Sequence, residues 1–256
     1  MKQTKKIIHL AFPAMMENLL QMLMGVVDNY LVAQVGLIAV SGVSVANNIM
    51  TIYQAVFIAL GAAVSSLVAK SRGEENNEKT VQYQSEAILV TLGLSLVLGL
   101  FSLLFGKTIL HWLGTETTVT QAGGLYLAIV GGLILSLGLM TTLSAFLRAL
   151  GKPQLPMYVS LLSNVLNAIF SAVSVFVFHW GIAGVACSTV LSRFIGTLLL
   201  ASQLPMSNIL KTIKWHLDSD LLKIALPAAG ERLMMRAGDV VIVAIIVKFG
   251  TEFVAG

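Results

Sequence analysis

The chain has 256 residues, of which 57% are hydrophobic and only 11% are charged, and its mean hydropathy is +0.88. Soluble domains carry about 25% charged residues, so this composition excludes an ordinary soluble protein and predicts an integral membrane protein with the lipid bilayer as its partner. The net charge of +4 is small and comes from Lys and Arg between the apolar stretches, which gives no support to nucleic-acid binding.

Long apolar stretches run through the whole sequence. A helix needs about 20 mostly apolar residues to cross the hydrocarbon core of a bilayer. Seven such stretches occur, at residues 7–33, 43–69, 82–106, 121–147, 154–179, 182–205 and 221–247. They are longer and more uniformly apolar than the alternating strands of a membrane β-barrel. We therefore predict an all-α fold, a polytopic membrane helix bundle with about seven spans.

Lysine and arginine between the spans predict the orientation. Three of these residues precede the first span, and eight more follow the second, fourth and sixth spans, whereas the opposite loops hold only Lys107. Because basic loops stay on the cytoplasmic side, we expect a multi-pass protein of the cell (plasma) membrane with a cytoplasmic N-terminus.

The first span contains an acidic residue, Asp28, within an apolar run. An ionisable residue in lipid costs several kcal/mol on the milder scales, so it is expected to face a cavity or a partner. Glu17, Gln21 and Asp28 are spaced by four and seven residues, which places them on one face of a helix. This polar stripe predicts a hydrated interior along the first helix.

Two other spans carry similar stripes. The second has Ser44, Asn47, Thr51 and Gln54, and the fifth has Ser160, Asn164, Asn167, Ser171 and Ser174. Such residues can line a shared cavity, or they can form hydrogen bonds between helices, as in any membrane bundle. Both interpretations stay open from the sequence.

The sixth and seventh spans contain arginines. Glu17 and Arg193 are both about ten to twelve residues from the cytoplasmic end of their spans, so they can form a buried ion pair. In the seventh span Arg232, Arg236 and Asp239 share one helix face, where mutual neutralisation is the simplest interpretation.

An internal repeat defines the domain organisation. Residues 7–42 align without gaps onto 221–256, so that Pro13 matches Pro227 and Glu17 matches Glu231. We predict an N-terminal six-helix lobe (1–206), a cytoplasmic linker (207–220) and the first helix of a second, parallel lobe (221–256). The chain is then expected to be a fragment of a twelve-helix protein that lacks most of its second lobe; the alternative is a natural short product that transports nothing.

Several segments together resemble the multidrug and toxic compound extrusion (MATE) family of exporters. They are the first-helix pattern P-x14-D that ends at Asp28, the segment 147–153 (LRALGKP), Asn164 and Asn167, and the segment 181–186 (GIAGVA). The resemblance implies a secondary antiporter that exports cationic amphiphilic substrates by alternating access, in exchange for H⁺ or Na⁺ and without another cofactor.

The same resemblance implies a coupling site made by Asp28, Asn167 and Thr189. Many relatives have an aspartate one turn after the asparagine, where this chain has Ser171. Sodium prefers several oxygen ligands, and one carboxylate with amide and hydroxyl groups would hold it weakly. A carboxyl group in an apolar environment can instead exchange a proton near neutral pH, so proton coupling is favoured over sodium coupling.

One rival function comes from the same superfamily: a flippase for lipid-linked saccharides, which a cavity lined by cations would favour. Enzymatic activity is not expected, because the sequence has no nucleotide-binding loop or nucleophile motif. Cys187 is the only cysteine and the four histidines are scattered near span ends, so no protein metal site is expected either.

Overall fold

The structure is a computed structural model that describes residues 15–16, 19, 26–212 and 219–254. All regular elements in these ranges are helical, which confirms the predicted all-α membrane bundle. Residues 26–35 form a helix that breaks at Gly36, where φ is 138°. The following elements are α2 (Leu37–Gly73), α3 (Asn77–Trp112), α4 (Thr117–Tyr126), the π-helix η1 (Leu127–Gly131), α5 (Leu135–Ala149), α6 (Gln154–Phe176), α7 (Gly181–Ser202), α8 (Met206–Lys211) and α9 (Ser219–Val254).

Four of the described helices are long and apolar enough to cross a membrane: α2, α3, α6 and α7. They correspond to the predicted spans at 43–69, 82–106, 154–179 and 182–205. The predicted fourth span is a bent pair, because α4 with η1 meets α5 at 47° across a short break. Most of the predicted first span lies outside the described residues. Helix α9 matches the predicted seventh span in position, but it has four charged residues between 231 and 239 and is not one of the four helices.

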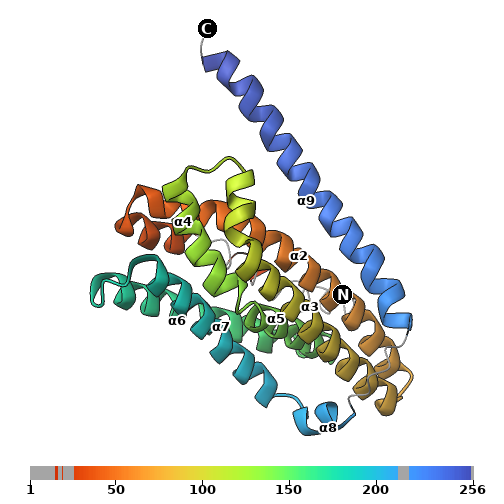
Figure 1. Ribbon diagram of the computed structural model, residues 1–256. Coiled ribbons are helices and arrows are strands. Elements are labelled where there is room, and N and C mark those ends of the chain that lie inside the picture. Colours follow the sequence, from red (N-terminus) through yellow and green to blue (C-terminus); the bar gives the residue numbers. More distant parts are fainter. Residues whose placement is uncertain (1–14, 17–18, 20–25, 213–218, 255–256) are drawn as a thin grey trace, which may run out of the picture.

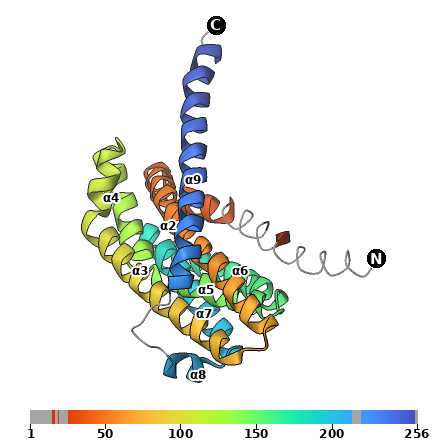
Figure 2. The ribbon, with the colours of Figure 1, turned by 90° about the vertical axis from the view of Figure 1, so that its right-hand side faces the viewer.

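Helix α2 is the centre of the bundle and packs against α3, α4, α5 and α9. Helices α6 and α7 form an antiparallel pair that joins the rest mainly through the contact of α7 with α5 (Figure 1). Helix α9 lies against α2, and its C-terminal part extends beyond the other helices in both views (Figures 1 and 2).

The turns between helices follow from local sequence. Asn76 caps α3 by accepting a hydrogen bond from the backbone N–H of Lys79 at 3.0 Å. Between α5 and α6, Gly151 has φ of 80°, a conformation that favours glycine, and Pro153 directly precedes α6. This turn holds α5 and α6 so that both reach the interior of the bundle.

Apolar side chains form two buried clusters, one around Phe57, Val130 and Ile134 and the other around Val64, Phe146 and Leu200. Small polar residues add direct helix–helix bonds. Thr91 of α3 and Thr142 of α5 are fully buried, and their hydroxyl groups lie 2.8 Å apart. Some polar residues of the helices therefore form hydrogen bonds between helices, which was one of the two interpretations left open by the sequence.

Candidate functional site

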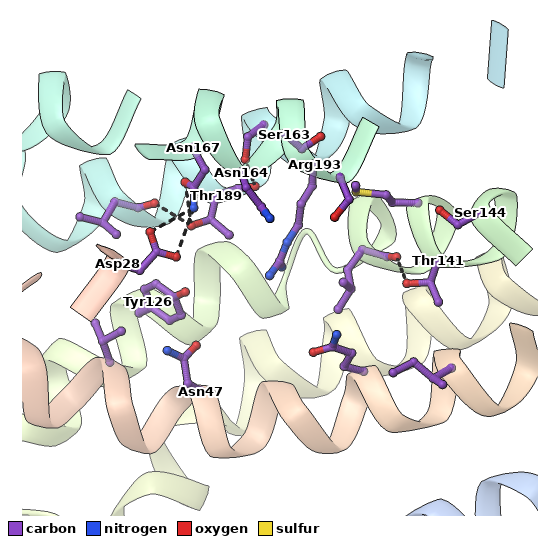
Figure 3. Close-up of a pocket in the computed structure, with 18 of the residues that line it drawn as sticks. Asp28, Asn47, Tyr126, Thr141, Ser144, Ser163, Asn164, Asn167, Thr189 and Arg193 are labelled. Carbon is purple, nitrogen blue, oxygen red and sulfur yellow. Dashed lines mark hydrogen bonds between the residues drawn. The ribbon is translucent and has the colours of Figure 1, made fainter. Parts of the chain in front are cut away.

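A cavity of about 540 Å³ lies among the helices of the bundle (Figure 3). Its wall is made by the helix at 26–35 together with α2, α4, α5, α6, α7 and α9. Its polar and charged lining residues include Asp28, Asn47, Gln54, Tyr126, Thr141, Ser144, Arg148, Ser160, Ser163, Asn164, Asn167, Thr189, Ser192, Arg193 and Arg232. The cavity is therefore polar although the chain around it is strongly apolar.

Asp28 and Asn167 form a side-chain hydrogen-bonded pair in the wall of the cavity. Asn167 Nδ2 donates to both carboxylate oxygens of Asp28, at 3.1 Å to Oδ1 and 3.2 Å to Oδ2. The two residues are 139 positions apart in sequence, so the fold of the whole lobe is needed to join them. Hydrogen bonds of this kind reduce the cost of a charged carboxylate away from bulk water.

Two hydroxyl groups surround the amide oxygen of Asn167. Ser171 Oγ donates to Asn167 Oδ1 at 3.3 Å, and Thr189 Oγ1 lies 3.5 Å from the same oxygen. An ionised carboxylate can only accept hydrogen bonds, whereas hydroxyl groups can donate, so the amide is oriented with its nitrogen toward Asp28. The predicted coupling residues Asp28, Asn167 and Thr189 thus lie together with Ser171. Asn167, Ser171 and Thr189 are buried.

Local sequence explains why these side chains face one another. On α6, Ser160, Asn164 and Asn167 are spaced by four and three residues and share one helix face, as the stripe predicted. Ser171 and Ser174 continue this face, and the Ser174 hydroxyl lies 3.3 Å from that of Ser188 on α7. Both interpretations of the stripe therefore apply. Ser160, Asn164 and Asn167 line the cavity, and Ser174 contacts α7.

The other predicted cavity residues divide into three groups. Asn47 and Gln54 of α2 and Asn164 of α6 line the cavity. Thr51 is exposed and does not line this cavity; its hydroxyl donates to the Asn48 carbonyl of its own helix at 2.7 Å. Glu17 and Gln21 lie outside the described residues, and with Glu17 the predicted ion pair to Arg193 does too.

Sequence reasoning missed one whole wall of the cavity. Leu137, Thr141, Ser144 and Arg148 of α5 all line it, and their spacing of four, three and four residues is the signal that could have revealed them. Arg148 lies at the end of the predicted fourth span, where a basic residue indicates only a cytoplasmic loop. Tyr126 also lines the cavity, next to η1; π-helical turns are frequent at functional sites.

The polar groups around Asp28 are one amide and two hydroxyl groups. Within the described ranges, no group of three His, Cys, Asp or Glu side chains could hold a metal. The Asn167 amide presents its nitrogen to Asp28 and its oxygen to hydroxyl groups.

A family model described as MatE matches residues 13–173 of the chain. Among curated proteins, a probable multidrug resistance protein NorM of Thermotoga maritima is 27% identical over 98% of this chain and 56% of its own length. An uncharacterized transporter of Bacillus subtilis, YisQ, is also 27% identical, over 98% of this chain and 57% of its own length. The chain thus spans somewhat more than half the length of these relatives.

Solved structures show the same fold. The outward-facing conformation of a multidrug resistance MATE family transporter has a TM-score of 0.87 at 18% identity and covers 95% of this chain and 56% of that chain. The inward-facing conformation has a TM-score of 0.78 at 19% identity, over 85% of this chain and 51% of that one. At this level of identity the similarity concerns the fold.

Proposed function

Since this chain belongs to the MatE family of integral membrane transporters, we propose that it contributes the first lobe of a cation-coupled antiporter that exports cationic amphiphilic compounds. The names of its relatives support drug or toxin export, and NorM of Thermotoga maritima is one of them. In this proposal the full protein has twelve helices, lies in the plasma membrane with a cytoplasmic N-terminus, and includes a second lobe that begins at α9.

The observation that carries the proposal is the carboxylate of Asp28 at the wall of the 540 Å³ cavity, fixed by two hydrogen bonds from Asn167. Its two protonation states differ by a full charge. A ligand or a proton shifts a conformational equilibrium only by its different affinity for the two states. Competition between a cationic substrate and a proton for the region of Asp28 would supply this difference and couple their movements in opposite directions.

Proton coupling is favoured over sodium coupling by the surroundings of Asp28. Ser171 occupies the position where many relatives carry a second carboxylate, and its hydroxyl is used by Asn167. A sodium ion would find one carboxylate and would have to reorient the Asn167 amide to gain another ligand. A proton needs only one oxygen of Asp28.

The cavity arginines favour a second candidate, a flippase for lipid-linked saccharides. Arg148, Arg193 and Arg232 could hold the phosphate groups of such a lipid. In that case the full-length protein would move a fluorescent lipid-linked saccharide between leaflets and would not export a soluble dye. The contact of Asp28 with Asn167 would then have no coupling role.

The substitution Asp28→Asn tests the coupling role of the carboxylate. It removes the exchangeable proton but keeps the size of the side chain, so ethidium efflux driven by a proton gradient should fall to the level of membranes without the transporter. Efflux is measured with full-length protein in proteoliposomes, where ΔpH and a sodium gradient can be imposed separately. Retained proton-driven efflux in Asp28→Asn would refute the assignment.

A matched control is Asp220→Asn. Asp220 is exposed in the first turn of α9, and its carboxylate lies 3.7 Å from the Lys223 ammonium group, away from the cavity. Because an exposed ion pair contributes little, this variant should transport like the original protein. A loss in both variants would indicate a general effect of charge on insertion instead of a role of Asp28.

A further inference from the structure

Arg193 of α7 brings a cationic side chain into the cavity that holds Asp28. Arg193 follows Thr189 by four residues, so the two side chains lie on one face of α7, one helical turn apart. Thr189 Oγ1 lies 3.5 Å from Asn167 Oδ1, and the amide of Asn167 binds Asp28. Figure 3 shows Arg193 extending from α7 into the cavity. The fold therefore places a cation about one helical turn from the proposed coupling residues.

The charge of Arg193 acts on Asp28 across this cavity. The guanidinium group interacts electrostatically with the Asp28 carboxylate and with the Tyr126 hydroxyl. Arg148 and Arg232 line the same cavity, but Arg193 is the arginine whose charge acts on Asp28. Among the described residues of the wall, Asp28 is the only acidic side chain. Since charged groups inside a membrane bundle are normally paired with one another, Arg193 is the internal counter-ion of Asp28.

This counter-ion is not locked onto the carboxylate. In the described part of the chain, Asp28 accepts its hydrogen bonds from Asn167 Nδ2, at 3.1 and 3.2 Å. Arg193 is half-buried and lines open cavity space, so its long side chain has room to change its rotamer. A buried ion pair in direct contact is costly to separate, whereas an interaction across a cavity can be exchanged for another cation.

We infer that Arg193 is a built-in competitor of the transported cation and lowers the affinity of Asp28 for a cationic guest. The guanidinium balances the carboxylate after the guest has left, and it moves away from Asp28 when a guest binds. The inference rests on the proposed export function and specifies how that function releases its substrate. A carboxylate without a counter-ion in an apolar bundle would hold a cation tightly, and an exporter must also let the cation go.

Ethidium binding tests the competition, because ethidium is a permanent cation and a fluorophore. Its Kd for the full-length protein is measured by fluorescence anisotropy in nanodiscs of neutral phosphatidylcholine, in alkaline buffer where few protons compete for Asp28. We expect Arg193→Gln to lower this Kd about tenfold, since a nearby opposite charge changes the equilibrium of a carboxylate by about that factor or more. Ethidium should also dissociate more slowly from this variant. Misfolding would weaken binding, so it cannot produce this result.

Two further substitutions control for the size and the charge of the side chain. Arg193→Lys keeps a cation on α7, so its Kd should stay close to that of the original protein. Arg72→Gln removes the same charge at an exposed position in the last turn of α2, outside the cavity wall, and should leave the Kd unchanged. Tighter binding in Arg72→Gln or an equal gain in Arg193→Lys would contradict a specific effect of the Arg193 charge.

Combining Asp28→Asn with Arg193→Gln tests whether the effect acts through Asp28. Once residue 28 is neutral, the loss of the Arg193 charge should increase the affinity for ethidium much less than it does in the original protein. An equal gain in both backgrounds would show a general repulsion of cations by the wall and would overturn the inference. If Arg193→Gln alone does not fold, folding of the double variant supports a balanced pair of charges. A double variant that also fails to fold would show a structural role of Arg193 and overturn the competition.

The outcomes separate this inference from the proposed function. If Asp28→Asn weakens ethidium binding but Arg193→Gln leaves it unchanged or weakens it too, the competition is refuted and the export proposal stands. Arg193 would then be balanced by another group, with the predicted partner Glu17 as the first candidate. If Asp28→Asn has no effect on ethidium binding, the proposed function itself is refuted.

Discussion

At the scale of single residues, the pairing of Asp28 with Asn167 explains how an acidic side chain can lie in a strongly apolar helix. The amide supplies donors to both carboxylate oxygens, and its own oxygen is held by Ser171 and Thr189. The carboxylate is therefore oriented by a short chain of side chains on α6 and α7. A substitution of Asn167, Ser171 or Thr189 should therefore alter how the Asp28 carboxylate binds a proton or a cation.

Ser171→Asp tests whether the ligand set limits sodium binding. The introduced carboxylate would take the place of a hydroxyl that now donates to Asn167, one helical turn away, and would add oxygen ligands next to Asp28. We expect the melting temperature of the variant to rise with NaCl relative to equal choline chloride, because a ligand that binds only the folded state stabilises it. The original protein should show no sodium-specific rise.

Ser174→Asp is the matched control for this prediction. Ser174 is also buried on α6, but its hydroxyl lies next to Ser188 of α7 and not next to Asn167. A sodium-specific rise in Ser174→Asp as well would contradict a local site at Asp28. An equal sodium-specific rise in the melting temperatures of the original protein and of Ser171→Asp would also contradict it.

Sequence patterns located only part of the candidate site. A lone carboxylate in an apolar run and a regular stripe of asparagines are strong signals, so Asp28, Asn164 and Asn167 could be named without coordinates. Thr51 has the same spacing as its neighbours on α2 but does not line the cavity, and spacing alone does not show which residues of a stripe reach it. Arg148 could not be named as a cavity residue, because a basic residue at the end of a span is also expected from topology alone.

At the scale of helices, close backbone contacts decide how α2 and α4 cross. A Cβ atom added at Gly42 would lie 2.6 Å from the Gly123 nitrogen and 2.9 Å from Ala122 Cβ. Both nearest groups belong to the facing helix, and one is backbone, so it cannot rotate away. Small residues at such crossings are typical of membrane helices, because they allow backbones to approach.

Gly42→Ala should therefore destabilise the lobe by about 1–3 kcal/mol, the usual range for overpacking. Thermal unfolding in detergent measures the change. Gly93→Ala is the control, since Gly93 lies within α3 and an added Cβ would meet nothing within 4 Å. It should leave stability unchanged or raise it slightly, because alanine favours a helix over glycine. Equal melting temperatures for the two variants would argue against this crossing.

Helix positions were easier to predict than helix shapes. Apolar length alone gave the ranges of α2, α3, α6 and α7 to within several residues. The 47° bend between α4 with η1 and α5 was not predicted, although Gly131 and Gly132 lie at the break. A glycine permits a bend but does not impose one. The bend depends on contacts with α3, where Gly99 approaches the Gly132 carbonyl, and these contacts join positions distant in sequence.

At the scale of the whole molecule, charged residues lie at the ends of the long helices as well as within the cavity. Basic residues flank the ends of the helices that the sequence assigns to the cytoplasm, such as Lys70 and Arg72 in the last turn of α2. The opposite turn, between α3 and α4, contains Gly114 and the exposed Glu116 but no basic residue. The repeat adds a second asymmetry, since Ile242 occupies the position in the second copy that corresponds to Asp28 in the first.

The proposed orientation, with the basic loops in the cytoplasm, can be tested with single cysteines at the two ends of α3. This helix has 36 residues, about 54 Å at 1.5 Å per residue, so Glu74 before it and Glu116 after it must lie on opposite sides of a bilayer. Both side chains are exposed, and Cys187→Ser removes the natural cysteine. In right-side-out vesicles, a membrane-impermeant maleimide should label Glu116→Cys at once and Glu74→Cys only after permeabilisation. Ethidium efflux of both variants verifies folding, and the reverse labelling pattern would show that the basic loops lie outside.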